Sequence, residues 1–294
     1  MILDYEYFKY CLNSKLFEDS YSDLIKKIAE NSERYTGLFR PTKPKTKLIQ
    51  NITQSHEIRF GDALEFIFER YFEAVGFTLH TKRIFLQDKE LNIDQLFSKD
   101  NKLYMIEQKV RDDHDSTKKV GQFNNFENKY YALTLQYKEF EIIPIMWFID
   151  DSLTKNRNYY LQEMHKLKND YGCIPYLFYG EQLFISEIAD FNIKIWNEIL
   201  LYLEQWKNGL PDMPEINFDK NTTNVFNEIK DLSPTIYRKL FTNDDIIQQI
   251  FPIIFPEKKV LRLLYDYFKK QEGQIYRTLG GYLQDLLTEK QSVT

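Results

Sequence analysis

Two acidic residues and a lysine near the middle of the chain have the types and spacing of a metal-assisted hydrolytic site. In the segment KLYMIEQKV (102–110), Glu107 and Lys109 are two residues apart, so in an extended strand both side chains lie on one face. Asp94 precedes them, and a turn predicted at 99–101 makes an antiparallel hairpin that brings Asp94 beside Glu107. An acid and a base at the end of an apolar strand would be costly to bury unless the pair has a function.

The chemistry that these side chains suit is phosphodiester hydrolysis. Asp94 and Glu107 offer hard oxygen ligands, and with the main-chain carbonyl of Gln108 and waters they suit Mg²⁺, which takes one or two protein carboxylates. A bound metal ion polarises the scissile phosphate and lowers the pKa of a bound water. Lys109, on the same face, would orient that water or stabilise charge that develops on the phosphate. The three residues therefore predict a magnesium-dependent site.

The surrounding sequence predicts a small sheet flanked by helices. A helix is expected from Gly61 to Gly76, since Leu64, Ile67, Phe68, Tyr71, Phe72 and Val75 form one apolar stripe. Strands are predicted at 82–87, 90–97, 102–110, 141–149 and 174–179, and helices at 120–137, 153–170 and 185–207. A strand, helix, strand order requires a crossover connection and a parallel pair of strands.

Ile93-Asp94, followed by Ile106-Glu107-Gln108-Lys109 in a hydrophobic strand, resembles the core of the PD-(D/E)xK nucleases, particularly type II restriction endonucleases. The resemblance covers roughly residues 60–150, although Ile93 stands where the motif name has proline. It implies an α/β (α+β) fold with a small mixed β-sheet, plus helical N- and C-terminal extensions. In that family a helix before the hairpin often supplies another acid, and Glu65 matches that place. The resemblance thus implies the catalytic residues Asp94, Glu107, Lys109 and Glu65 and the metal ligands Asp94, Glu107 and Gln108.

The polar segment 111–119 directly follows the predicted catalytic strand and is a candidate for DNA contact. Arg111, Lys118 and Lys119 would contact phosphates, while Ser116 and Thr117 would reach base edges or water in a groove. The alternative is a solvated turn. Gln122, in the next helix, matches a polar position that faces the site in related nucleases, with a surface glutamine as the alternative.

A second basic segment lies near the N-terminus. RYTGLFRPTKPKTK (34–47) contains five basic residues and no acid, and among them Arg40, Lys43 and Lys45 are candidates for contacts with the DNA backbone. The alternative is a solvated linker.

Composition limits the class of protein. The chain has 294 residues, is 43% hydrophobic and has a net charge of −5. This charge argues against a protein that only binds nucleic acid, but it permits a nuclease with positive charge along the groove that meets DNA. Cys11 and Cys173 lack neighbours at zinc-ligand spacing, and no glycine-rich phosphate loop occurs. The first residues lack signal-peptide features, and no apolar run approaches the roughly 18 residues of a membrane helix, so we expect a cytoplasmic protein.

Three regions are predicted along the chain: a helical N-terminal segment with the basic loop at 1–55, a nuclease core at 56–207 and a helical C-terminal region at 208–294. The expected function is Mg²⁺-dependent cleavage of double-stranded DNA at a short sequence. Cutting both strands requires two active sites, so we expect a homodimer or a second nuclease subunit, with a DNA methyltransferase encoded separately. The alternatives are a DNA repair or junction nuclease and a catalytically silent DNA-binding protein of the same fold.

Overall fold

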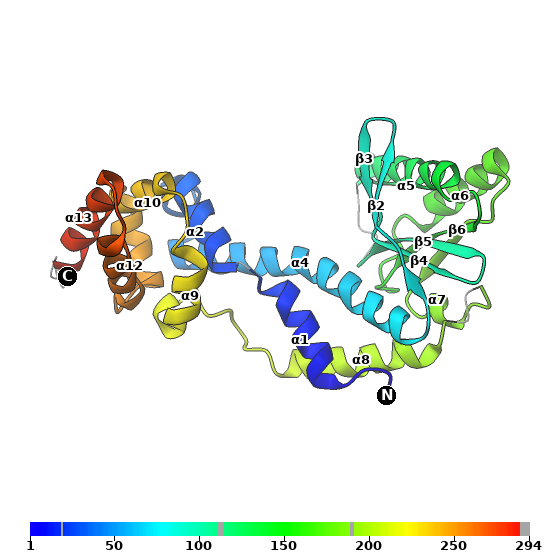
Figure 1. Cartoon of the computed structure of the whole chain (residues 1–294), viewed down its shortest axis with the longest axis horizontal. Helices are drawn as coiled ribbons and strands as arrows, with labels where there is room; N and C mark the ends of the chain where they lie inside the picture. Colours follow the sequence, from blue (N-terminus) through cyan, green and yellow to red (C-terminus); the bar gives the residue numbers. More distant parts are fainter. Residues whose placement is uncertain (19, 111–114, 189–190, 289–294) are drawn as a thin grey trace. The chain divides into compact units, whose positions relative to one another are not determined.

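The computed structural model describes residues 1–18, 20–110, 115–188 and 191–288 (Figure 1). The chain forms two compact units. Unit 1 comprises residues 1–16 and 59–210, and unit 2 comprises residues 17–58 and 211–294. Each unit has buried apolar side chains of its own, and only α4 contributes to the cores of both.

Unit 1 is organised around a five-stranded mixed sheet with the strand order β1-β4-β5-β6-β7. The strands are β1 (Thr78–Leu79), β4 (Gln95–Lys99), β5 (Lys102–Lys109), β6 (Glu141–Phe148) and β7 (Tyr176–Tyr179). β4 and β5 form the predicted antiparallel hairpin, and β5 pairs with β6 in parallel, as the strand, helix, strand order predicted. The strand that carries Glu107 and Lys109 is therefore the central one.

Helices cover both faces of this sheet (Figure 1). Tyr104 and Ile106 of β5 belong to the core on one face, whereas Leu103 and Met105 belong to the core on the other, so the predicted alternation is confirmed. The first face packs against α1 (Tyr5–Leu16), the end of α4 (Pro44–Ala74), α7 (Gln182–Ile185) and α8 (Ile193–Asn208); the second packs against α5 (Ser116–Gln136) and α6 (Arg157–Tyr171).

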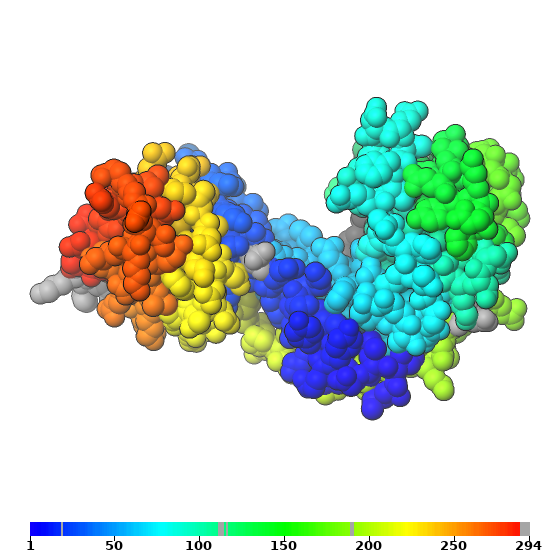
Figure 2. All heavy atoms as spheres, viewed as in Figure 1, coloured from blue at the N-terminus to red at the C-terminus, as the bar shows by residue number. Residues whose placement is uncertain are grey.

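The predicted strand 90–97 is two strands in the structure. Its first half, β3 (Lys89–Asn92), pairs with β2 (Arg83–Leu86) in a separate hairpin, and its second half is β4 of the main sheet. The chain changes partner at Asp94, which consequently lies between strands and not within one. The β2–β3 hairpin projects from the surface of unit 1 (Figure 2).

Unit 2 consists of helices in the part of the chain that the structure describes, in agreement with the prediction for the C-terminal region. Its helices are α2 (Ser20–Glu30), α3 (Glu33–Thr36), the beginning of α4, η1 (Phe218–Asn221), α9 (Thr222–Ile229), α10 (Pro234–Phe241), η2 (Ile246–Ile250), α11 (Phe251–Ile254), α12 (Lys259–Lys270) and α13 (Gln274–Thr288). No described helix is long and apolar enough to cross a membrane.

The helix predicted to start at Gly61 starts at Pro44. The apolar residues of α4 belong to two cores. Leu48 packs in the core of unit 2, whereas the buried apolar residues between 63 and 72 pack in the core of unit 1. The first 16 residues also join unit 1, where the Glu198 carboxylate accepts the backbone N–H groups of Ile2 and Leu3. The compact units therefore differ in make-up from the predicted division into 1–55, 56–207 and 208–294.

Phe68 on α4 is a test of the core of unit 1. It is fully buried, and its ring meets the Trp147 ring edge-on at 4.7 Å. Phe68→Ala should lower the free energy of unfolding by about 3–5 kcal/mol because it removes a large buried side chain and leaves a cavity. Urea unfolding measures this change. Phe85→Ala, at a half-exposed position of β2, is the control and should lower the free energy of unfolding by less than about 1 kcal/mol. Equal effects of the two substitutions would contradict this packing.

Candidate active site

The carboxyl end of β5 and the residue before β4 meet at one edge of the sheet. Gln95 of β4 is opposite Ile106 of β5, so continuing this antiparallel register by one residue places Asp94 opposite Glu107. The neighbouring strand β6 is parallel to β5 and pairs Lys109 with Phe148. Asp94, Glu107 and Lys109 are therefore brought together by strand pairing, as the sequence predicted.

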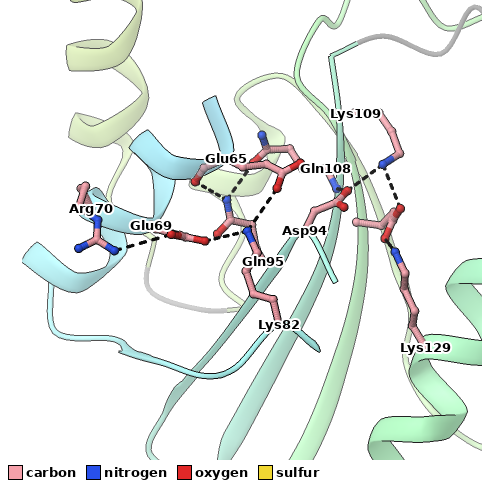
Figure 3. A network of polar contacts seen from close by, with 10 residues as sticks. Glu65, Glu69, Arg70, Lys82, Asp94, Gln95, Gln108, Lys109 and Lys129 are labelled. Atoms are coloured by element: carbon pink, nitrogen blue, oxygen red, sulfur yellow. Dashed lines mark hydrogen bonds and ion pairs between the residues drawn. The ribbon is translucent and has the colours of Figure 1, made fainter. Parts of the chain in front are cut away.

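A lysine bridges the two carboxylates. Lys109 Nζ lies 2.8 Å from Asp94 Oδ2 and 2.9 Å from Glu107 Oε1 (Figure 3). The backbone N–H of Gln108 also donates to Asp94 Oδ2, at 2.8 Å, which fixes the orientation of that carboxylate. The side chains of Glu107, Asp94 and Lys109 are 5%, 15% and 28% exposed, so solvent reaches the cluster mainly at the lysine.

A second lysine, which the sequence analysis did not identify, holds Glu107 from the other side. Lys129 of α5 is almost fully buried, and its Nζ lies 2.5 Å from Glu107 Oε2 (Figure 3). It occupies the apolar stripe of α5 between Phe126 and Leu133, both of which are buried. A lysine in an apolar stripe is a signal that sequence inspection can use, because a buried lysine requires an acidic partner.

Glu65 takes part in a neighbouring polar network on α4. Its carboxylate lies 3.3 Å from Lys82 Nζ, which also contacts Glu69 at 2.9 Å (Figure 3). The side-chain amide of Gln95 donates to the main-chain oxygen of Glu65 at 2.8 Å and to Gln108 Oε1 at 3.3 Å. Gln95 thus links Glu65 to β4 and β5, and Lys82, which precedes β2, joins Glu65 to Glu69. The sequence analysis singled out neither Gln95 nor Lys82.

The local charges shift two pKa values in this region. Burial, with the Asp94 carboxylate as the next cause, raises the pKa of Glu65 to about 8, although Lys82 and Lys109 act in the opposite direction. Burial would lower the pKa of Lys109, but the Glu107 and Asp94 carboxylates outweigh it and hold the pKa above its ordinary value. Lys109 therefore stays cationic, whereas Glu65 retains its proton at neutral pH.

The donor set at the sheet edge fits a hard divalent cation. Asp94 and Glu107 already share one cationic group, the Lys109 ammonium, which lies within hydrogen-bond distance of an oxygen from each. The described residues contain no cluster of three or more His, Cys, Asp or Glu side chains suited to a metal ion. Two carboxylates are nevertheless sufficient for Mg²⁺, which completes its shell with water and main-chain oxygens.

Four of the residues predicted to contact DNA after β5 lie at the beginning of α5: Ser116, Thr117, Lys118 and Lys119. Asp115 caps this helix by accepting the N–H of Lys118, and Lys119 Nζ lies over the Tyr159 ring at 4.8 Å. Thr117 and Lys118 are exposed, Ser116 is the first residue of the helix, and Arg111 lies outside the described residues.

Gln122 lies on the inner side of α5 and accepts a hydrogen bond from the Tyr160 hydroxyl at 3.0 Å. Its side-chain nitrogen is buried and has no hydrogen-bond partner among the described residues. Gln122 is only partly exposed, so the alternative of an ordinary surface glutamine does not describe it.

The other predicted DNA contacts belong to unit 2. Arg40 and Lys43 are exposed in the connection between α3 and α4, and Lys45 is exposed in the first turn of α4. The basic segment is therefore part loop and part helix, and the predicted loop at 34–47 ends at Lys43 because Pro44 begins the helix.

Part of unit 1 matches a known protein family. Residues 68–207 match the family of the type II restriction endonuclease HinfI. This segment contains Asp94, Glu107, Lys109 and Lys129 and lies within unit 1. No curated protein and no solved structure matches the chain.

The raised pKa of Glu65 has a consequence for stability. The folded protein, with a pKa of about 8, holds this proton more tightly than the unfolded chain, whose glutamates titrate near about 4.3. Stability due to Glu65 should therefore be lost as the pH rises from about 5 to 8. Glu65→Gln is permanently neutral at this position. The melting temperature of this variant minus that of the native protein should therefore increase as the pH rises across this range.

The control for this titration is Glu257→Gln, at a half-exposed position of unit 2. Its melting temperature relative to the native protein should stay constant between pH 5 and pH 8. A constant difference for Glu65→Gln would contradict the pKa assigned to this carboxyl.

The buried pair of Lys129 and Glu107 can be tested by a double-mutant cycle. Lys129→Met leaves one oxygen of a buried carboxylate without its partner and should lower the free energy of unfolding by about 3 kcal/mol. Adding Glu107→Gln removes the charge and should recover much of this loss. Urea unfolding of the four proteins measures the coupling, and strictly additive effects would show that the two side chains do not interact.

Proposed function

Residues 68–207 are a type II restriction endonuclease domain of the HinfI family, and from this premise we propose that Asp94, Glu107 and Lys109 form its active site and that Mg²⁺ is its cofactor. Proteins of this family cleave DNA at specific sites and are typically metal-dependent. The observation that carries the proposal is the placement of two carboxylate oxygens around a single cationic group at the end of the central strand.

The roles of the residues follow from their contacts. Asp94 and Glu107 would hold the metal ion through their carboxylates, and the main-chain oxygen of Gln108 would be a further ligand. A bound Mg²⁺ supplies charge to polarise the phosphate and activate water. Lys129 occupies the other oxygen of Glu107, so only Oε1 remains for the metal. Lys129 is thus a positioning residue.

Lys109 has two successive roles in this proposal. In the free protein its ammonium forms ion pairs with both carboxylates. With a metal ion held by the carboxylates, the ammonium would be available to orient the attacking water or to stabilise negative charge on a phosphate oxygen. Glu65, whose pKa is raised by burial and by the Asp94 carboxylate, is the fourth residue that we assign to the site.

The proposed substrate is double-stranded DNA, and Lys118, which is exposed in the first turn of α5, is suited to contact it. Lys118 and its neighbour Lys119 are proposed to bind phosphates, as is Arg111, which lies outside the described residues; Ser116, Thr117 and Gln122 are proposed to contribute polar contacts near the bases. Cleavage of both strands requires two copies of the site, so the active form is a homodimer or a pair with a second nuclease subunit. A separately encoded methyltransferase would protect the host sites.

The first experiment is digestion of unmethylated phage DNA with the purified protein and Mg²⁺. Discrete bands on a gel are expected, and sequencing their ends would identify the recognition site. A smear or nicking only at branched structures would instead indicate a nuclease that does not depend on sequence, and uncut DNA with Mg²⁺ or Mn²⁺ would refute the proposal.

The residue assignment is tested by Asp94→Ala and Lys109→Ala. Each should reduce the cleavage rate by at least about 100-fold, because each removes an interaction made with the reacting phosphate or its metal ion. Binding of the site-containing duplex, measured with Ca²⁺ in place of Mg²⁺, should change much less. Lys166→Ala, which removes an exposed lysine on α6, is the control and should cleave normally. Retained cleavage by either active-site variant would place the site elsewhere.

A further inference from the structure

A turn in unit 2 exposes two adjacent apolar side chains. Leu38 and Phe39 are 91% and 98% exposed, in the connection between α3 and α4. The Arg40 N–H donates to the Gly37 carbonyl at 3.1 Å, so Leu38 and Phe39 are the two central residues of a four-residue turn. Fully covering a leucine or phenylalanine is worth about 1.5–3 kcal/mol, so two such neighbours at the tip of a turn are suited to contact another molecule.

The turn is held firmly at its base. Tyr35 before it and Leu48 after it are fully buried in the core of unit 2. The Gly37 N–H donates to the Glu33 carbonyl at 3.0 Å, and a Cβ atom at position 37 would lie only 2.5 Å from that oxygen. Glycine is therefore required for this close approach, and it sets the point where the chain turns outward.

The residues next to the apolar tip in the sequence carry positive charge only. From Arg34 to His56 the sequence contains five Lys and Arg residues and no Asp or Glu. Arg40, Lys43 and Lys45 are exposed, and none of them forms an ion pair with another described residue. The nearest acids in the sequence, Glu33 and Glu57, lie outside this stretch. The partner of this surface should therefore be a polyanion.

We propose that the turn is a DNA wedge, in which Leu38 and Phe39 press against the bases while Arg40, Lys43 and Lys45 bind the flanking phosphates. This rests on the proposed function in one respect, namely that the polyanion is the duplex to be cut. Apolar side chains inserted at a base step partly unstack it, and an aromatic ring can stack on any base. Cations on either side of the tip would neutralise the phosphates next to that step.

The combination of features favours DNA over a protein partner. Protein interfaces bury apolar anchors in a centre that is depleted of charged residues, and lysine is among the residues least common there. Here the two exposed apolar side chains belong to a stretch of sequence, 34–56, that contains five basic residues and no acid. A surface of anionic lipid has a related chemistry, and it is therefore an outcome that the experiment must separate.

The test measures binding of the full chain to a 30-base-pair duplex that contains the cleavage site, with Ca²⁺ and over a range of NaCl concentrations. Leu38→Ser/Phe39→Ser should raise the Kd by about 10-fold or more, since base stacking contributes on this scale, and should leave the salt dependence unchanged. Arg40→Gln/Lys43→Gln/Lys45→Gln should instead reduce the slope of log Kd against log salt by roughly two to three. Ile275→Ser, at a half-exposed position in the same unit, is the control and should bind normally.

A second variant keeps the test decisive if serine at positions 38 and 39 lowers the melting temperature. Phe39→Trp retains an aromatic ring, so the Kd should stay within about twofold of the native value. Binding of DNA should then change the tryptophan emission beyond the change seen with the native protein, because the new indole would stack on a base. Absence of this additional change would overturn the wedge.

The remaining outcomes separate the two proposals. If the native protein cuts and binds DNA but Leu38→Ser/Phe39→Ser binds within about twofold of it, the wedge is wrong and the proposed function stands. If the native protein binds no duplex, the proposed function fails, and the wedge fails with it because it rests on DNA binding. If phosphatidylserine vesicles capture the native protein but not the double variant, and DNA binding is equal for both, the turn is a lipid contact and the wedge is refuted.

Discussion

The mutual neutralisation of four charged side chains at the end of the central strand is the interaction on which the site depends. Asp94, Glu107, Lys109 and Lys129 carry two negative and two positive charges, and each of the two carboxylates accepts at least one lysine. Burying an isolated charge costs several kcal/mol, so the cluster is stable only when its members are held together. The hairpin, the central strand and α5 each supply part of it, which explains why these elements must pack in this register.

The two lysines differ in a way that divides their roles. Lys129 is 3% exposed and is fixed by the packing of α5, whereas Lys109 is 28% exposed and reaches the cluster from the open side. When a divalent cation is added to a neutral cluster, one existing cation must give way. The exposed lysine can do so at little cost because water can solvate it, while the buried one cannot. In the proposed function Lys129 is therefore the permanent partner of Glu107, and Lys109 is the partner that a metal ion would replace.

Local patterns allowed the central part of the site to be predicted. The alternation along β5 put Glu107 and Lys109 on one face, the turn at Asp100 gave the hairpin, and the strand, helix, strand order gave the parallel neighbour. The segment 90–97 was taken as one strand because periodicity cannot show that the chain changes pairing partner at Asp94. Lys129 was missed since its role depends on a contact across 22 residues.

The family match is confined to one of the two units. The matched segment 68–207 lies within unit 1, whereas unit 2 lies wholly outside the match and carries the basic turn. In the proposed mechanism hydrolysis uses the two carboxylates, Lys109 and a metal ion, and one end of the sheet supplies these three side chains. Cleavage at specific sites also requires contacts with bases and phosphates away from the scissile bond. In our proposal the turn with its apolar tip and neighbouring basic residues provides such contacts from unit 2, and the candidate active site is in unit 1. Substitutions in the turn can therefore change the affinity for DNA without changing the residues proposed to carry out hydrolysis.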